Sequence, residues 1–203
     1  MAEATTPTPR TPLDGCIGPI GGPSDASVVL GELRFQGKIN LRGDVADKAF
    51  TAAVAKAVGV EPPATPGTVA TAGERAILWL GPDEWLVVTP AGDGALADTL
   101  NAALAGMRAS ATDVSDNYAA VRIAGPKARW VLAKGWAVDL HPSAFGPGRV
   151  AQSHLALTNA IIRQTDDVPS FEILVRPSFA KYLWDWLTDS SLEVAYRVAS
   201  HHS

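Results

Sequence analysis

The chain has 203 residues, of which 47% are hydrophobic and 19% charged, and its net charge at pH 7 is −4. This length allows one domain or two small lobes that share a core, and the composition is typical of a globular protein. The acidic balance argues against nucleic acid or an acidic membrane as a partner, because both require a basic face. The sequence contains no run of about 18 apolar residues, so we expect no transmembrane helix.

The N-terminal stretch MAEATTPTPRTPLDG lacks the apolar region of a secretory signal. The chain has one cysteine, Cys16, and cannot form an intrachain disulfide. Together these features predict a cytoplasmic protein.

Residues 1–26 are rich in Thr, Pro and Gly and cannot close a core of their own. Two interpretations stay open for this segment. It is either a disordered tail, as chain termini often are, or an extended arm that lies along a partner. The apolar side chains of Cys16, Ile17 and Ile20 support the arm, because a free tail would not need them.

A first α+β half is predicted over residues 27–114. It begins with a strand at 33–41, LRFQGKINL, in which apolar residues can alternate and a glycine suggests a bulge. A helix follows, because Asp44 or Asp47 can cap its free N–H groups and an apolar stripe leads to Gly59, a plausible C-cap.

The Pro-rich stretch 61–73 is predicted to be a loop. Residues 75–88, RAILWLGPDEWLVV, are two short apolar runs joined by turn formers, which indicates a β-hairpin. A helix at 94–107 and a strand at 111–114 complete the half. The order strand, helix, strand, strand, helix, strand is that of a split βαβ unit of ferredoxin-like type.

A second half is predicted over residues 115–203, with the boundary near Val114–Asn117. Its elements are a strand at 118–123, a helix opened by Gly125–Pro126, two apolar segments at 150–157 and 159–163, a strand at 171–175, a helix from Pro177 and a strand at 192–198. The two halves share an element order, so we read one compact, pseudo-duplicated domain.

The helix that begins near Pro177 is apolar on two sides. One side carries Phe179, Leu183, Trp186 and Leu187, and the other carries Tyr182 and Trp184. Such a helix is either fully buried or has a partner on its second face. The chain has six Trp, a residue type enriched at interfaces. We therefore expect that replacing Tyr182 and Trp184 by Ala weakens assembly more than folding.

Four segments carry a family resemblance: LGPDEWL at 80–86, NLRGD at 40–44, SDNYAAVRIAGPKARWVL at 115–132 and SFEILVRPSFAKYLWDWL at 170–187. The first resembles the gamma subunit of the heterotetrameric sarcosine oxidases. The last two resemble strand–turn–helix units of the aminomethyltransferase (T-protein) superfamily. The resemblance spans about residues 40–187.

The resemblance implies an α+β fold of duplicated split-βαβ (ferredoxin-like) units, of the aminomethyltransferase folate-binding type. It implies an assembly that oxidises sarcosine with O2 to glycine and H2O2. The one-carbon unit would pass to tetrahydrofolate as 5,10-methylene-tetrahydrofolate or leave as formaldehyde. FAD, covalent FMN, NAD and zinc would belong to the other subunits. This chain would be a structural subunit without catalytic, cofactor-binding or metal-binding residues, held by the alpha, beta and delta subunits and mainly by the large alpha subunit.

The sequence agrees with that division, because it has neither a GxGxxG dinucleotide motif nor a P-loop. The segment 146–151, GPGRVA, is one glycine short and leads into a strand. Asp83 and Glu84 lie at a turn, where carboxylates are ordinarily solvated. No segment matches the transferase site.

Other candidate residues have plainer interpretations. His141 and His154 are 13 positions apart and lack the compact spacing of zinc ligands. Ser178 and Lys181 fit an SxxK spacing, but a Ser after Pro is ordinarily a helix cap. Cys16 has no nearby His to activate it.

Asp113 and Asp116 flank Ser115 and could form a polar site, although a capped turn is the plainer interpretation. The tripeptide Arg42-Gly43-Asp44 occurs often by chance, and a cytoplasmic chain has no use for it as an adhesion signal.

Two alternative functions stay open. One is a stand-alone folate-binding, one-carbon transfer enzyme of the same superfamily. The other is an iron–sulfur-maintenance protein of the same fold, whose hallmark is a Cys between Gly and Tyr in its later part, whereas Cys16 lies in the arm. Binding of tetrahydrofolate by the isolated chain would separate both from a structural subunit.

Overall fold

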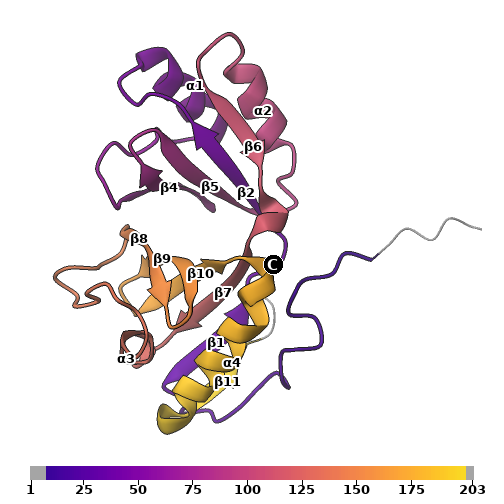
Figure 1. The fold of residues 1–203 in the computed structure, drawn as a ribbon, viewed down its shortest axis with the longest axis vertical. Helices are drawn as coiled ribbons and strands as arrows, with labels where there is room; N and C mark the ends of the chain where they lie inside the picture. The colour runs from indigo at the N-terminus through magenta and orange to yellow at the C-terminus, as the bar shows by residue number, and fades with distance from the viewer. Residues whose placement is uncertain (1–7, 200–203) are drawn as a thin grey trace, which may run out of the picture.

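The structure is a computed structural model that describes residues 8–199. The chain forms two β-sheets that face each other, with helices on the outer face of each (Figure 1). The first sheet has the order β3-β4-β5-β2-β6 and neighbouring strands run antiparallel. Its elements are β2 (Gln36–Arg42), α1 (Lys48–Val58), β3 (Val69–Ala72), β4 (Arg75–Gly81), β5 (Glu84–Ala91), α2 (Leu96–Ala103) and β6 (Ser110–Asp113).

The second sheet has the order β11-β1-β7-β10-β9-β8. Its elements are β1 (Val28–Glu32), β7 (Ala119–Ala124), α3 (Ala128–Ala133), β8 (Val150–Leu155), β9 (Thr158–Asp166), β10 (Ser170–Val175), α4 (Ala180–Ser191) and β11 (Tyr196–Val198). Short 3-10 turns lie at Ser115–Asn117, Pro177–Phe179 and Leu192–Val194. The last of these occupies the start of the strand predicted at 192–198.

The strand alternation divides the core into three parts. In β10, Phe171 and Ile173 lie on the face of the sheet that packs against α3 and α4, whereas Leu174 lies on the face toward the other sheet. In β4, Ile77 packs beneath α1 and α2, and Leu78 packs between the sheets. The molecule is therefore layered as helices, sheet, sheet and helices, which confirms the predicted α+β class.

The first sheet contains the predicted split βαβ unit, because β6, β2, β5 and β4 are neighbours in that order. In the second sheet, β7, β10 and β9 follow the order of β2, β5 and β4. The place beside β7 that corresponds to β6 is taken by β1, which pairs antiparallel with β7 and parallel with β11. A strand from the predicted first half thus lies in the sheet of the second half.

Local signals placed several elements correctly. Asp47 caps α1, where its Oδ1 accepts a hydrogen bond from the Ala49 N–H at 2.8 Å, and Gly59 ends the helix at a φ of 103°. The predicted hairpin is β4–β5, and the bulge expected in the first strand lies between Gln36 and Gly37. The prediction of a loop over 61–73 was wrong in its last part, because β3 pairs there with β4.

Two of the family-like segments, NLRGD and LGPDEWL, contact each other directly. The Asn40 amide donates to Glu84 Oε1 at 2.7 Å, and Arg42 forms ion pairs with Asp83 at 3.2 Å and Glu84 at 3.0 Å. The Gly43 N–H donates to the Asp83 carbonyl at 3.2 Å. Asp83 is 69% exposed and therefore solvated as expected, and both turn carboxylates are in addition paired with Arg42 at the end of β2. Arg42-Gly43-Asp44 is part of this fold contact.

The described part of the N-terminal segment, residues 8–26, packs on its own chain. Leu13 is fully buried in the core beneath α4, with Cys16 and Ile17 packed against it. Asp14 pairs with Arg34 at 2.6 Å, and Gly21 exchanges two backbone hydrogen bonds with Val198. The described part of the segment is thus not a free tail, whereas contact of its exposed residues 18–25 with a partner stays a prediction. Residues 1–7 lie outside the described residues.

The second face of α4 is covered by this N-terminal segment. Trp184 is 3% exposed and belongs to the core of the second half. Trp184 and residues 18–22 line the same small hollow. The Tyr182 hydroxyl accepts a hydrogen bond from the Leu157 N–H at 3.2 Å. The prediction that Trp184 contacts a partner was therefore wrong. The residues that cover Trp184 are distant from it in the chain, and a helical pattern does not reveal them.

We expect Trp184→Ala to lower the free energy of unfolding by about 3–5 kcal/mol, because it leaves a cavity the size of an indole between α4 and the N-terminal segment. Urea unfolding of the isolated chain measures this loss. Lys181→Ala, on the exposed side of the same helix, is the control and should change stability by less than about 0.5 kcal/mol. Equal stability of the two variants would contradict this packing.

We expect Gly43→Ala to destabilise the chain by about 1–3 kcal/mol, because the added methyl would overlap the ring of Phe50. Phe50 cannot move freely, since it is buried and packs on Trp85 with ring centroids 5.7 Å apart. Thermal unfolding compares this variant with Gly94→Ala, where a methyl meets no atom within 4 Å. A smaller loss at position 43 than at 94 would refute the close contact.

Candidate functional site

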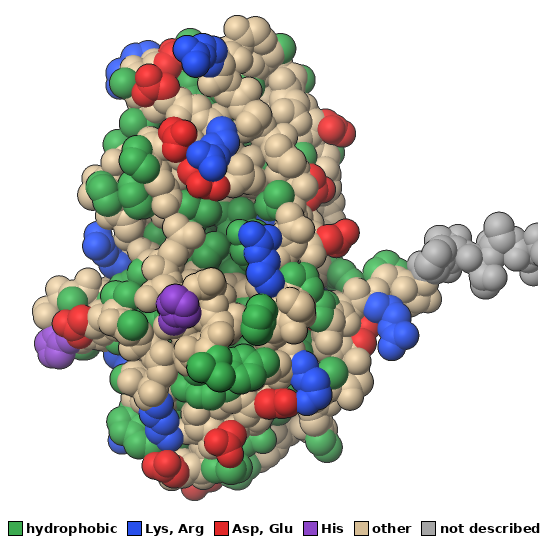
Figure 2. All heavy atoms as spheres, in the orientation of Figure 1, with side chains coloured by type: hydrophobic (Ala, Val, Ile, Leu, Met, Phe, Trp, Pro, Cys, Tyr) green, Lys and Arg blue, Asp and Glu red, His purple; other side chains and the backbone are tan. Residues whose placement is uncertain are grey.

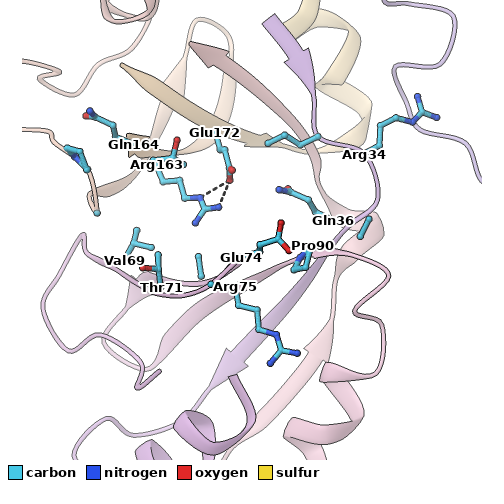
Figure 3. A pocket seen from close by; sticks show the side chains of 17 residues that line it. Arg34, Gln36, Val69, Thr71, Glu74, Arg75, Pro90, Arg163, Gln164 and Glu172 are labelled. Carbon is cyan, nitrogen blue, oxygen red and sulfur yellow. Dashed lines mark hydrogen bonds and ion pairs between the residues drawn. The ribbon is translucent and has the colours of Figure 1, made fainter. Parts of the chain in front are cut away.

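A hollow of about 710 Å³ opens where the two sheets part from each other (Figure 3). The first sheet contributes Val69, Thr71 and Glu74 from β3 and its turn, and the second contributes Arg163 and Glu172 from β9 and β10. The Arg75 side chain points away from the hollow toward the helices, where it pairs with Asp93 at 2.8 Å. The volume lies in the range of small-molecule sites.

A buried ion pair lies at one wall of this hollow. Arg163 and Glu172 are directly opposite on β9 and β10, and Arg163 Nη2 lies 2.6 Å from Glu172 Oε2. Their side chains are 9% and 13% exposed. Arg163 Nε also donates to Oε2, at 2.7 Å. The other carboxylate oxygen, Oε1, accepts no hydrogen bond from residues 8–199 and is available to a ligand or water.

A second polar group in the hollow is an unpaired acceptor. Gln36 Oε1 is buried and has no hydrogen-bond partner within the described chain. Gln36 is the first residue of β2 and pairs with Ala91 of β5, directly before the bulge at which the register shifts. A buried amide oxygen without a partner costs about 1–3 kcal/mol. This side chain is therefore poised to accept a hydrogen bond from something outside the chain.

A second hollow, of about 420 Å³, lies on the other side of Leu33 and Gln36, which line both. Lys38 of β2 lines it and is 2% exposed. Its Nζ donates to the Gln36 carbonyl at 2.9 Å. Burial lowers the pKa of Lys38 to about 8, although the carboxylates of Asp116, Glu172 and Asp113 act in the opposite direction.

The predicted turn around Ser115 is a capped turn. Asp113 Oδ1 accepts hydrogen bonds from the Ser115 N–H at 2.8 Å and from its hydroxyl at 2.6 Å. These bonds hold the pKa of Asp113 below its usual value. The Ser115 hydroxyl in turn accepts from the Lys38 N–H at 3.0 Å. The turn thus fixes the backbone of Lys38 and joins the two sheets.

The remaining candidates do not converge on a site. His141 lies in a loop, where its Nδ1 is 2.7 Å from the Ser143 hydroxyl, and His154 lies on β8. Residues 8–199 contain no group of three side chains able to hold a metal ion. Lys181 pairs with Asp185 rather than with Ser178, and Ser178 caps no helix. The segment 146–151 turns into β8, a strand, as predicted.

Sequence reasoning missed Lys38, Arg163 and Glu172. The available signal was a charge inside an otherwise apolar strand: Glu172 within FEILV and Arg163 within AIIRQ. Such a position implies that the strand's second face is also covered, but the pattern alone does not say by what. The burial of Lys38 was harder to predict. Polar and apolar residues alternate around it in the sequence, which is the pattern of a strand whose polar side chains face solvent.

Acidic and basic side chains are interspersed on the face of the molecule shown in Figure 2. No extended surface of one charge sign is visible there. Among the described residues, no helix is long and apolar enough to cross a membrane.

Comparison with known proteins finds a matching family and similar sequences. The model of the sarcosine oxidase, gamma subunit family matches residues 42–193. Sarcosine oxidase subunit gamma of Arthrobacter sp is 39% identical over 175 residues, which are 86% of this chain and 85% of that protein.

Two solved structures are similar in fold. A chain of the heterotetrameric sarcosine oxidase from Corynebacterium sp. U-96, in complex with pyrrole 2-carboxylate, is 32% identical with a TM-score of 0.81, over 92% of this chain and 96% of that one. The glycine cleavage system aminomethyltransferase T from Bartonella henselae matches with a TM-score of 0.67 at 16% identity, over 87% of this chain and 48% of that one. The second likeness concerns the fold alone. On the family match and these identities, the chain belongs to the sarcosine oxidase gamma subunit family.

Proposed function

We propose that this chain is the non-catalytic, structural gamma subunit of a heterotetrameric sarcosine oxidase. The assembly would oxidise sarcosine with O2 to glycine and H2O2, and would pass the one-carbon unit to tetrahydrofolate as 5,10-methylene-tetrahydrofolate or release formaldehyde. The observation that carries the proposal is the match to a chain of such an oxidase over nearly the full length of both, at a TM-score of 0.81. FAD, covalent FMN, NAD and zinc would be held by the other subunits, in the cytoplasm.

The charged groups of the family-like segments support a structural role. Arg42 of β2 pairs with Asp83 of the hairpin turn and with Glu84 of β5, and Arg163 of β9 pairs with Glu172 of β10. These pairs connect β2 with the hairpin and β9 with β10 within this chain. Pairing within the chain favours a role of these charges in the fold.

The surface offers apolar side chains that a partner subunit would cover. Those exposed by more than 40% are Ile20, Phe35, Trp130, Leu157, Val168, Phe179 and Leu192. Trp130, 41% exposed, is the most exposed tryptophan of the described chain, since Trp85, Trp136 and Trp184 are buried and the other two are half-buried. Exposed aromatic groups are typical anchors of interfaces. The alpha, beta and delta subunits, mainly the large alpha subunit, are the proposed partners.

Affinity capture of the tagged chain from its native cells tests this function. We expect a yellow eluate that contains larger subunits, absorbs as a flavoprotein and produces peroxide when sarcosine is added. The flavin would accompany the partners, so the chain alone, expressed separately, should be colourless and inactive. A colourless eluate with a single species from native cells would overturn the assignment.

A second candidate is the stand-alone folate-binding, one-carbon transfer protein, and the hollow between the sheets favours it. That hollow has the volume of a ligand site and a buried acceptor, Gln36 Oε1, without a partner in the described chain. An iron–sulfur-maintenance protein of the same fold gains no such support, since Cys16 lies in the N-terminal segment and packs against the core.

Calorimetric titration of the isolated chain with tetrahydrofolate separates the two candidates. We expect no saturable heat, because a structural subunit does not need the hollow filled. A Gln36→Ala variant serves as the control for any heat that does occur. Saturable binding that this variant weakens by about tenfold or more, the worth of one hydrogen bond to a buried group, would transfer the assignment to the folate-binding candidate.

A further inference from the structure

Lys38 is a buried amine at the edge of a hollow. It lies on β2, the strand between β5 and β6, and its residue is 2% exposed. The hollow of about 420 Å³ that it lines is also bordered by Ser115, Asp116 and Tyr118. Most lysines place the ammonium group in water, so an amine in this position requires a physical account.

The amine lacks a close counter-charge. Its Nζ donates to the Gln36 carbonyl at 2.9 Å, and no carboxylate within residues 8–199 lies within ion-pair distance of it. Three carboxylates face it from farther away: Asp116 from the 3-10 turn, Asp113 from β6 and Glu172 from β10.

Two further charged residues that border this hollow, Glu32 and Arg10, form ion pairs with residues other than Lys38. Glu32 of β1 pairs with Arg34 at 3.1 Å, and Arg34 also pairs with Asp14. Arg10 lies at the rim and reaches Asp14 at 3.8 Å.

This environment increases the share of neutral amine. With the pKa of Lys38 at about 8, about a quarter of the side chain is unprotonated at pH 7.5. For an ordinary lysine with a pKa of about 10.4 that share is about one in a thousand, so the difference is about 200-fold. The neutral amine is the nucleophilic form, and desolvation is the usual way in which proteins activate lysine.

We propose that Lys38 is a covalent carbonyl-binding site that takes a small aldehyde entering the hollow beside Tyr118. The Nζ lone pair forms a bond to the carbonyl carbon while the C=O π bond breaks and the oxygen takes up a proton. Nζ gives up one proton when the carbinolamine forms. The carbinolamine hydroxyl then takes up a second proton and leaves as water while the nitrogen lone pair forms the C=N bond, and loss of the last N–H proton leaves a neutral imine between Nζ and the aldehyde carbon. Asp116 and Tyr118 border the same hollow and can exchange the protons of both steps.

The size and polarity of the hollow define the ligand class. A volume of about 420 Å³ admits an aldehyde of a few heavy atoms in addition to water. The rim carries charges of both signs, Arg10 and Asp116, so it has no strong preference for an anion. The inference rests on this hollow and on the burial of Lys38, and it is independent of the proposed oxidase subunit role.

Reductive methylation with limiting formaldehyde and cyanoborohydride tests the site in the full-length chain. Peptide mapping by mass spectrometry then measures the rate at each lysine at pH 7.5. We expect Lys38 to be modified at least tenfold faster than Lys48 and Lys56, which are exposed on α1. In concentrated urea the difference should vanish, because unfolding returns Lys38 to water. A Lys38 rate equal to or below those of the two control lysines in the folded chain would overturn the proposal.

The pH profile gives a second readout that a merely structural lysine would not show. The rate at Lys38 should level off above about pH 8, whereas the rates at Lys48 and Lys56 should continue to rise. Lys38→Met should remove the fast-labelled site, and Lys48→Met should leave it intact. If Lys38→Met does not fold, the wild-type map still decides, and parallel pH profiles at all three lysines would refute the site.

Discussion

The structure depends on one constraint: each sheet has helices on one face, so the two remaining faces must cover each other. The cover is apolar where Leu78 and Leu86 of the first sheet meet Ile161 and Leu174 of the second. It is not complete, because the sheets diverge on either side of Gln36 and leave two hollows. Charged side chains with little exposure line both hollows: Arg163 and its partner Glu172 line the first, and Glu32 and Lys38 line the second. The position of the candidate sites thus follows from the way two twisted sheets meet.

The N-terminal part of the chain holds the two sheets together. β1 is inserted between β7 and β11, and three residues later the chain enters β2 of the other sheet. The crossing passes Phe35 at a φ of 54°, a conformation that costs energy for a residue with a side chain. Arg34 anchors the crossing through its ion pairs with Asp14 and Glu32. A second crossing at Ser115–Asn117 returns the chain to the second sheet, which is incomplete without β1 of the first half.

The elements that sequence reasoning placed correctly depend on neighbours in the chain. The cap of α1 at Asp47, its end at Gly59 and the β4–β5 turn are each set by a few consecutive residues, whose backbone preferences act within one turn of chain. β1 was missed because its partner β7 is distant in the chain, and β3 was missed because it lies at the end of a Pro-rich stretch. Trp184 was misplaced for the same reason: the segment that covers it is more than 160 positions away.

The buried charges differ in what they contribute to the fold. Replacing a buried ion pair by apolar side chains is often neutral or stabilising, so Arg163 and Glu172 are weak evidence for stability. They do specify register, because a slip of one residue between β9 and β10 would turn one of the two charges into the apolar core beneath α3 and α4 and leave the other without its partner. Lys38 lies opposite Val88 of β5 and has no ion-pair partner within salt-bridge distance in the described chain, so it fixes no register. Its burial is a cost to folding that the more distant carboxylates of Asp116, Glu172 and Asp113 offset only in part, which is the kind of cost that points to chemistry at the amine.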